Sequence, residues 1–307
     1  MVKVCIVGAG VIGLTTAWQV VQQIKDATVY VVANNFTTET TSHGAAGIIC
    51  PQIHISRRYP DYKRLCLESW QYFNDIVKNG IGREAGVSVV DGYQLYEEDV
   101  PEENEYFKSF VYHFSSVNPD SLEFIPTTCK IVKAYHFTTL LVECRNFLPY
   151  LMKKLRERGV TFLKRHITDF YELAVEDFDL IFNCAALGNR LLMNDKEMYV
   201  ARGQVLRVRA PWIKQFVIYG DYTYIFPGQD LCVLGGTHQD ENENLKIDEN
   251  DRKSILDRCI SIFPSLADAE IDHEWVGLRP YRNTYRIEEG ESLEYKGKRC
   301  RIIHNYG

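Results

Sequence analysis

The strongest constraint on the fold lies in the first 32 residues. A run of β-forming residues over Lys3–Val7 is followed by the glycine motif Gly8-Ala9-Gly10-Val11-Ile12-Gly13, a helix-compatible stretch over Leu14–Lys25 and a second apolar run over Thr28–Val32. This order predicts a β-α-β unit that has its glycines between strand and helix. Glycine suits each place, because Gly8 turns the chain, Gly10 admits a phosphate closely and Gly13 packs the helix onto the strand.

In this setting the glycine motif predicts a dinucleotide-binding site. The helix after it would offer free N–H groups and its positive dipole end to a pyrophosphate. The acid that usually binds the ribose is absent, because the second strand leads into Asn34 and Asn35, whose amides bond hydroxyls without charge assistance. The motif does not distinguish a flavin from a nicotinamide dinucleotide, and a glycine turn without a ligand is the remaining alternative.

The rest of the chain predicts two domains, because 307 residues exceed what one hydrophobic core usually serves. Before about residue 196 the pattern alternates strands and helices, with helices expected over Asp61–Lys78 and Phe147–Gly159 and strands over Val160–Leu163 and Phe178–Phe182. Afterwards the pattern favours antiparallel strands, over Gly203–Arg209, Tyr222–Phe226 and Leu231–Leu234, with one helix over Glu249–Ile262. We therefore expect an α/β fold: a Rossmann-like domain with a parallel sheet, and a substrate domain built on a mostly antiparallel sheet. The expected limits are 1–50, 138–195 and 285–307 for the first domain, and 51–137 and 196–284 for the second.

Composition excludes several classes of protein. The 41 acidic residues outnumber the 35 Lys and Arg, and the net charge of −6 argues against nucleic-acid binding. The nine cysteines are scattered, without the spacing of a zinc site or a disulfide framework, and the acidic loops show no metal-ligand spacing. No apolar stretch approaches the roughly 20 residues of a membrane helix, and the start of the chain lacks the layout of a signal peptide. These features favour an intracellular protein that binds neither membranes nor nucleic acid.

Several further motifs resemble the D-amino-acid oxidase family, in order and across essentially the whole chain. They are Thr40-Thr41-Ser42-His43-Gly44-Ala45-Ala46-Gly47, Arg202-Gly203-Gln204-Val205-Leu206, Tyr222–Gly228, Leu234-Gly235-Gly236-Thr237, Gly277-Leu278-Arg279-Pro280-Tyr281-Arg282 and Ile302–Gly307. Within the family, the motif around Tyr224 and the one around Arg279 are more similar to the oxidases of D-aspartate than to those of neutral substrates.

This resemblance implies non-covalently bound FAD and the oxidation of a D-amino acid by O₂. The products would be H₂O₂, ammonia and a 2-oxo acid. The residues that match the FAD contacts of the family are Gly8, Ala9, Gly10, Val11, Ile12, Gly13, Asn34, Asn35, Thr41, Ser42, Gly47, Ile48, Ile167 and Gly307. The family usually has glycine where this chain has Ala186, whose methyl group either is tolerated or crowds the backbone.

The resemblance also implies a set of substrate-binding residues. Arg279 matches the arginine that binds the α-carboxylate, which a guanidinium meets bidentately, and Tyr224 matches the tyrosine that fixes the same group. Oxidases of D-aspartate carry a second arginine after Gly-Gly-Thr, where this chain has His238, and a histidine binds an anion well only when it is protonated. Gln52 stands where the family has His or Tyr, with His54, Arg57 and Arg58 nearby either as substitutes or as a solvated basic loop.

We expect oxidation of acidic D-amino acids, D-aspartate and D-glutamate. The alternatives are an oxidase of neutral or basic D-amino acids, a catalytically impaired relative and, more distantly, an NAD-dependent dehydrogenase. The chain stops at Gly307, inside a motif that in the family continues through a glycine-rich turn into a helix, so a chain of this length is expected to hold FAD more weakly. The expected location is peroxisomal or cytoplasmic, and a homo-oligomer is left open.

Overall fold

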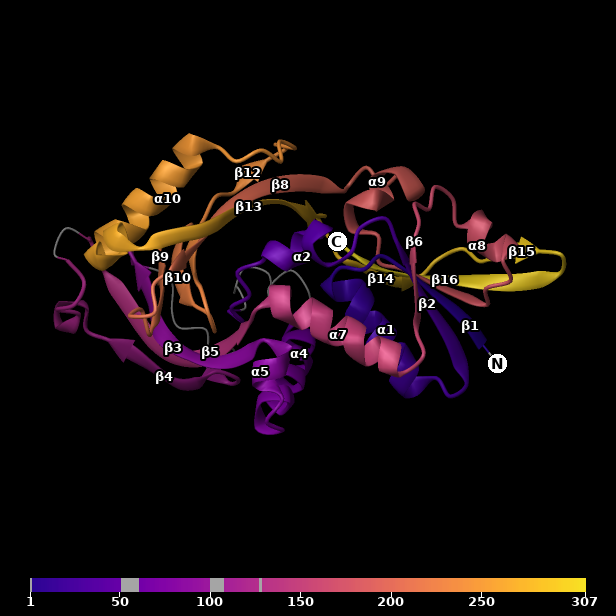
Figure 1. Cartoon of the computed structure of the whole chain (residues 1–307), viewed down its shortest axis with the longest axis horizontal. Coiled ribbons are helices and arrows are strands. Elements are labelled where there is room, and N and C mark those ends of the chain that lie inside the picture. Colours follow the sequence, from indigo (N-terminus) through magenta and orange to yellow (C-terminus); the bar gives the residue numbers. More distant parts are fainter. Residues whose placement is uncertain (1, 51–60, 100–107, 127–128) are drawn as a thin grey trace.

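The computed structural model describes residues 2–50, 61–99, 108–126 and 129–307. These residues form two sheets that lie side by side, sheet A at the right and sheet B at the left of Figure 1. The short helix α2 (Thr41–Gly44) lies where the two sheets meet and contacts elements that belong to both sides.

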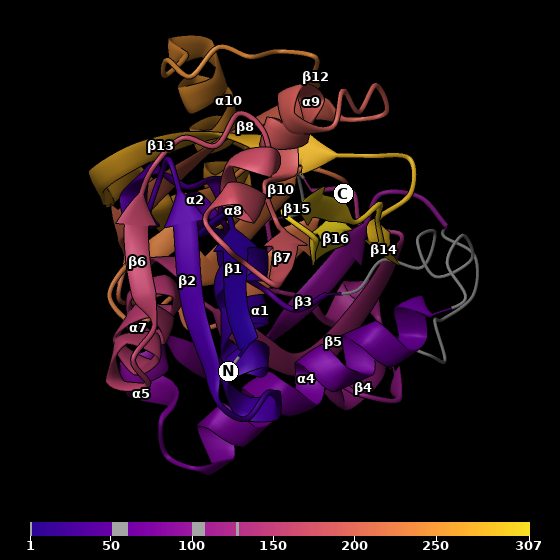
Figure 2. The same cartoon turned by 90° about the vertical axis from the view of Figure 1, so that its right-hand side faces the viewer.

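Sheet A runs in the order β14-β16-β7-β1-β2-β6, with β15 paired to β16, and Figure 2 shows most of this sequence of strands. Its central strands are parallel, whereas β14 and β15 pair antiparallel to β16. The bounds are β1 (Val2–Val7), β2 (Ala27–Ala33), β6 (Thr161–Lys164), β7 (Leu180–Asn183), β14 (Arg286–Glu289), β15 (Leu293–Tyr295) and β16 (Lys298–Tyr306).

Helices cover both faces of sheet A, which explains why β1 is almost continuously apolar. On one face lie α1 (Val11–Gln23) and α7 (Cys144–Glu157), whose buried residues include Leu14, Ala17 and Phe147. On the other lies α8 (Tyr171–Val175), which packs with Ile167 and Cys300. The sheet is thus the middle layer of a doubly covered α/β unit, as the glycine motif predicts.

Sheet B runs in the order β12-β8-β11-β10-β9-β3-β5-β4, with β13 also paired to β8. All its pairs are antiparallel except β3 with β9. The bounds are β3 (Val87–Tyr96), β4 (Tyr112–Val117), β5 (Lys133–Val142), β8 (Tyr199–Arg209), β9 (Phe216–Tyr219), β10 (Thr223–Pro227), β11 (Cys232–Gly235), β12 (Gln239–Asp240) and β13 (Glu270–Tyr281).

Helix α10 (Glu249–Ile262) closes one side of sheet B by burying Ile255, Cys259 and Ile262 against β8, β10 and β11. Helix α4 (Tyr62–Lys78) brings Trp70 to the other core. The remaining short helices are α5 (Gly82–Ala85), α9 (Asn189–Leu192) and the 3₁₀ turns η1 (Thr37–Glu39), η2 (Pro119–Ser121), η3 (Ala186–Gly188) and η4 (Pro264–Asp268).

The fold class expected from the sequence is confirmed, and α7 shows the main local difference. This helix begins at Cys144, three residues before the expected Phe147, with Glu143 as its N-cap. Pro149 therefore lies inside the helix, where it removes one backbone hydrogen bond. Burial of Phe147, Leu151 and Leu155 on one face stabilises the helix in spite of that loss.

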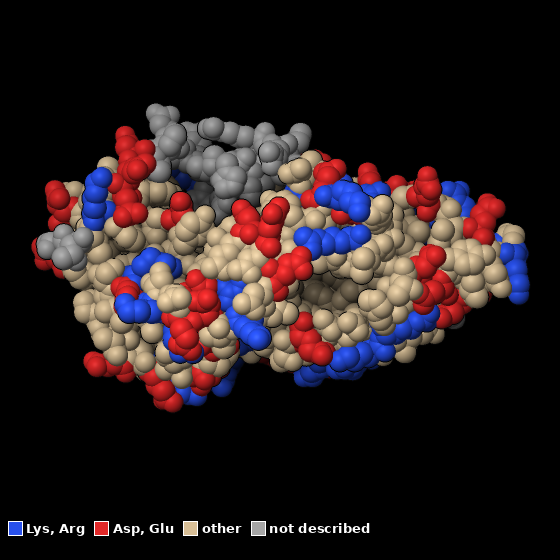
Figure 3. Space-filling model, turned by 90° about the horizontal axis from the view of Figure 1, so that it is seen from above, with Lys and Arg blue, Asp and Glu red and all other residues tan. Residues whose placement is uncertain are grey.

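The charge distribution on the surface and the character of the helices bear on the classes of partner. Seen from above, acidic and basic side chains are interspersed, and the face has a hollow near its middle (Figure 3). Within the described residues, no helix combines the length and the apolar character needed to cross a membrane.

Candidate active site

The glycine motif forms a tight turn between β1 and α1. Gly8 has φ +117°, and a Cβ atom there would lie 2.3 Å from the carbonyl oxygen of Cys184. A Cβ atom on Gly13 would lie 2.0 Å from the carbonyl oxygen of Gly8. Side chains are thus excluded from both positions by backbone atoms, which cannot move aside.

The start of α1 presents hydrogen-bond donors at this turn. Gly10 is the N-cap of the helix and carries no side chain that could cap it. The N–H of Val11 donates to Ser42 Oγ over 3.0 Å, and the other first-turn amides have no acceptor within the helix. These free donors and the positive helix end suit an anionic pyrophosphate.

Helix α2 links the glycine turn to sheet B. Ser42 accepts the bond from Val11, whereas Thr41 Oγ1 donates to the carbonyl oxygen of Leu278 on β13 over 2.9 Å. Gly44 packs directly against the indole ring of Trp275, also on β13, and a Cβ atom on Gly44 would lie 2.0 Å from that ring. One turn of helix therefore sits between the predicted dinucleotide site and the strand that carries Arg279.

The carboxyl ends of β2 and β6 form the other end of the predicted dinucleotide site. Asn34 and Asn35 follow β2 and are exposed, so their amides are accessible to ribose hydroxyls. Ile167 is a core residue, 6% exposed, and can contact a ligand mainly through its backbone. Gly47 has φ +90° and abuts the carbonyl of Val142, and Ile48 forms an isolated bridge with Leu141.

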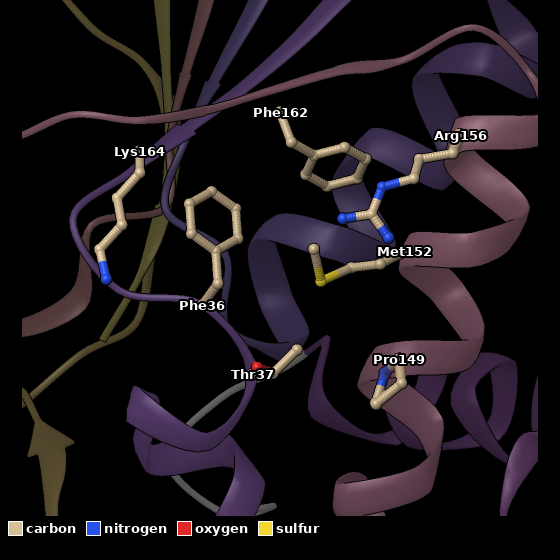
Figure 4. A pocket seen from close by; sticks show the side chains of 7 residues that line it. All are labelled: Phe36, Thr37, Pro149, Met152, Arg156, Phe162 and Lys164. Atoms are coloured by element: carbon tan, nitrogen blue, oxygen red, sulfur yellow. The ribbon is translucent and has the colours of Figure 1, made fainter.

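A cavity of about 390 Å³ lies beside this end, between the loop after β2 and helix α7 (Figure 4). It contains none of the residues expected from the sequence. Arg156 enters it from α7 with its guanidinium 5.0 Å from the ring of Phe162, and Lys164 lies on the opposite side, where it pairs with Glu39. The complete lining is Phe36, Thr37, Pro149, Met152, Arg156, Phe162 and Lys164.

The residues present therefore fit a dinucleotide such as FAD. The Gly8–Gly13 turn leaves no space for side chains at Gly8 and Gly13, so that its backbone is open to a ligand. Free amide donors lie at the start of α1, and hydroxyl and amide side chains lie nearby. The missing acid at Asn34 weakens the hold on the ribose without blocking it.

Arg279 and Tyr224 meet on sheet B, as the sequence predicts for an anion site. Arg279 Nη1 donates to the carbonyl oxygen of Thr237 over 3.0 Å, and its guanidinium lies against Gly203, where a Cβ atom would be 2.4 Å from Cζ. Among the described residues no carboxylate pairs with Arg279, so the alternative of an Arg–acid surface pair does not apply there. Burial raises the pKa of Tyr224, and the positive charge of Arg279 opposes that rise.

His238 lies beside this pair. Its ring is 5.4 Å from that of Tyr281, two residues along β13 from Arg279, and 6.0 Å from that of Tyr222. His238 Nε2 is 2.9 Å from Asp240 Oδ1. An anionic side chain would therefore compete with Asp240 for the imidazole.

The sequence missed the partners that shape the site. Tyr281 and Asp240 each stand two residues from a predicted position, and that spacing places side chains on the same face of an extended chain. Gln52 and its neighbours His54, Arg57 and Arg58 lie outside the described residues.

Comparisons with known proteins add an independent line of evidence. The family model described as "FAD dependent oxidoreductase" matches residues 3–307. D-aspartate oxidase of Homo sapiens is 36% identical over 306 residues, which cover 99% of this chain and 88% of that protein. D-aspartate oxidase 1 of Caenorhabditis elegans is 33% identical, with 99% and 90% covered, and a D-amino acid oxidase of Dugesia ryukyuensis is 31% identical, with 99% and 91% covered.

Solved structures show the same fold at low identity. Glycine oxidase from Geobacillus kaustophilus superposes with a TM-score of 0.80 at 16% identity and covers 100% of this chain and 90% of its own. L-α-glycerophosphate oxidase from Mycoplasma pneumoniae, determined with FAD bound, gives a TM-score of 0.70 at 15% identity, with 99% and 90% covered.

Proposed function

Because the chain belongs to the family of FAD-dependent oxidoreductases whose model spans residues 3–307, we propose that it deaminates D-amino acids oxidatively, with acidic ones as its preferred substrates. The reaction consumes O₂ and yields H₂O₂, ammonia and the 2-oxo acid. Its relatives named as oxidases of D-aspartate and of D-amino acids support this substrate class.

The observation that carries the proposal is the unpaired guanidinium of Arg279. Arg279 is half-buried and has no carboxylate partner among the described residues, and the α-carboxylate of an amino acid supplies the opposite charge in bidentate geometry. The hydroxyl of Tyr224 feels the charge of the same guanidinium and can donate to the second carboxylate oxygen. Arg279 and Tyr224 would thus hold one end of the substrate.

The residues that would hold FAD are the Gly8–Gly13 turn, Asn34, Asn35, Thr41 and Ser42. When bound, FAD would accept a hydride from the α-carbon of the substrate and pass the electrons to O₂. The protein fixes the substrate by its carboxylate, orients the α-carbon and keeps water away. The ammonium group of the substrate releases one proton to solvent before the transfer, so no side chain is assigned as its acceptor.

The position of His238 bears on the preference for acidic substrates. A protonated imidazole beside Arg279 would attract a second carboxylate. Its bond to Asp240 favours a second candidate, an oxidase of neutral or basic D-amino acids, because Asp240 occupies the imidazole and adds a negative charge. The two candidates differ in a measurable ratio of rates.

The direct test is a visible spectrum of the purified protein before and after anaerobic addition of D-aspartate. Flavin bands that bleach with D-aspartate and more slowly with D-alanine are the expected result. A colourless protein that does not take up added FAD would overturn the function, and faster bleaching by D-alanine would overturn the acidic preference alone.

A variant tests the role of Arg279. Arg279→Met should lower kcat/KM for D-aspartate by about 10²- to 10⁴-fold, because two charged hydrogen bonds of roughly 1.5–3 kcal/mol each are lost. Arg279→Lys should fall between, since it keeps the charge and loses the bidentate geometry. The flavin spectrum should stay unchanged in both, and Arg209→Met, an exposed arginine on β8, serves as the control.

The strands of sheet A all lie within the limits proposed for the first domain, and those of sheet B lie within the second except β5, which continues to Val142 beyond the proposed limit at residue 137. For location, a reaction that releases H₂O₂ favours the peroxisome over the cytoplasm. Imaging of the tagged full-length protein tests that choice, and sedimentation of the holoenzyme tests for a homo-oligomer.

A further inference from the structure

A buried arginine outside the substrate site has an unused donor. Arg207 lies near the carboxyl end of β8, between His273 on β13 and Val233 on β11, and is 2% exposed. Its Nη2 donates to the carbonyl oxygens of Gly44 and Ala45 over 3.4 and 3.3 Å. Its Nη1 is buried and has no hydrogen-bond partner within the described part of the chain.

No carboxylate among the described residues forms an ion pair with Arg207, and Glu143, whose charge acts on it, is already engaged. Glu143 is 1% exposed, but its Oε1 is 3.2 Å from Arg145 Nε and its Oε2 accepts from the N–H of Gln229 over 2.8 Å. Arg145 also lies 3.7 Å from Asp230, which is on the surface. Two guanidinium groups therefore share a single buried carboxylate, and burial together with Arg145 lowers the pKa of Arg207.

A second nitrogen without a hydrogen-bond partner among the described residues lies on α2, the short helix to which Arg207 donates. His43 immediately precedes Gly44, and its Nδ1 is buried without a partner among the described residues. Burial lowers the pKa of His43, with Arg207, His273 and Arg145 adding to the shift, so the ring is neutral at pH 7. A neutral imidazole can still donate one N–H.

We propose that a small inorganic anion, such as chloride, binds in this buried region and accepts a hydrogen bond from Arg207 Nη1, with His43 Nδ1 as its second donor. An unpaired buried charge is costly in a protein, and an unsatisfied buried donor marks a place for a water or an ion. The excess positive charge selects an anion over a water molecule. The anion would fasten α2, which carries Thr41 and Ser42, onto β8. The proposal does not depend on the proposed oxidase activity.

Thermal unfolding of the holoenzyme tests the site. With bromide replacing methanesulfonate at constant ionic strength, the midpoint should rise by about 2–4 °C for each tenfold increase above the dissociation constant. Arg207→Met should abolish this dependence, whereas Arg209→Met should keep it. Arg279→Met should also keep it, which separates the buried site from halide bound where the substrate carboxylate would lie. A wild-type midpoint that does not respond to bromide would overturn the proposal.

Diffraction from crystals of the wild-type holoenzyme grown in bromide provides a readout that survives a failure of Arg207→Met to fold. An anomalous peak within hydrogen-bond distance of Arg207 Nη1 is the expected result. Density for a water at that place without an anomalous signal would refute the anion.

Discussion

Ala186 is held in a backbone conformation that suits glycine. Its φ of +48° lies in the left-handed region, which costs an alanine about 1–2 kcal/mol. The residues that precede it are held in place, because the N–H of Ala185 donates to Asn183 Oδ1 over 3.2 Å and the Cys184 carbonyl abuts Gly8. The methyl group is thus tolerated next to the dinucleotide turn at the expense of strain.

Ala186→Gly should therefore stabilise the protein by about 1 kcal/mol, since relief of the strain outweighs the extra freedom of the unfolded chain. The matched control is Ala185→Gly, at a residue with an ordinary φ of −77°, which should destabilise by about 0.5–1 kcal/mol. Chemical denaturation of the holoenzyme measures both changes. Equal losses of stability in the two variants would contradict the assignment of strain.

His238 is the residue at which substrate preference can be changed. His238→Arg should raise the ratio of kcat/KM for D-aspartate over D-alanine by about 10- to 100-fold, because a permanent charge adds a hydrogen bond of roughly 1.5–3 kcal/mol to the side-chain carboxylate. The gain should be larger when Asp240→Asn removes the competing carboxylate. Steady-state kinetics on both substrates measure the ratio, and an unchanged ratio in the double variant would place the side-chain site elsewhere.

At the scale of elements, the turn between β1 and α1 has no room for a side chain at Gly8. Gly8→Ala should abolish FAD binding, because the methyl group would meet the Cys184 carbonyl in a conformation that already strains an alanine. Gly80→Ala is the control: its φ of +74° is also left-handed, but nothing lies within 4 Å of the added atom. The control should lose about 1 kcal/mol of stability and keep its flavin. Fluorescence titration with FAD distinguishes the two.

The elements predicted best from the sequence are those specified by local chemistry. The unit β1-α1-β2 follows from its glycines and its apolar runs, and α10 follows from an apolar periodicity that stops before Pro264. The long strands β3, β5 and β13 were not predicted, because their pairing joins distant residues, such as Leu278 with Arg202, and no local pattern encodes that. That Arg279, Tyr224 and His238 belong to one site was predicted only from the family resemblance. Their proximity depends on the pairing of distant strands, which no local sequence pattern encodes.

At the scale of the whole molecule, two histidines, the half-buried His43 and the buried His304, connect stability to pH. Burial lowers the pKa of His43, and it also lowers that of His304, which is 1% exposed and has its Nδ1 3.0 Å from Asn183 Nδ2. Below pH 6.5 the unfolded chain binds more protons than the native protein at these two groups, so stability falls as the pH falls.

The free energy of unfolding should therefore decrease between pH 6.5 and 5 by up to about 1.4 kcal/mol per pH unit for each histidine. Urea denaturation of the holoenzyme at pH 7.5, 6.5 and 5.5 measures the slope. His43→Gln should reduce the slope of unfolding free energy against pH by the contribution of one histidine. His113→Gln, which changes an exposed histidine, should leave the slope unchanged. A stability that is constant over this range would show that neither ring stays neutral in the native state.

The parallel pairing of β16 with β7 has a consequence for biosynthesis. Asn183 and His304, neighbours across these strands, are 121 residues apart in the chain. At roughly 5–20 residues per second, a ribosome needs about 6–24 s to make the intervening segment. During that interval the edge of β7 has no partner, and an unpaired edge invites pairing with another nascent chain. The late arrival of β16 makes the yield of folded enzyme sensitive to chaperones and to the rate of translation, independently of how stable the finished protein is.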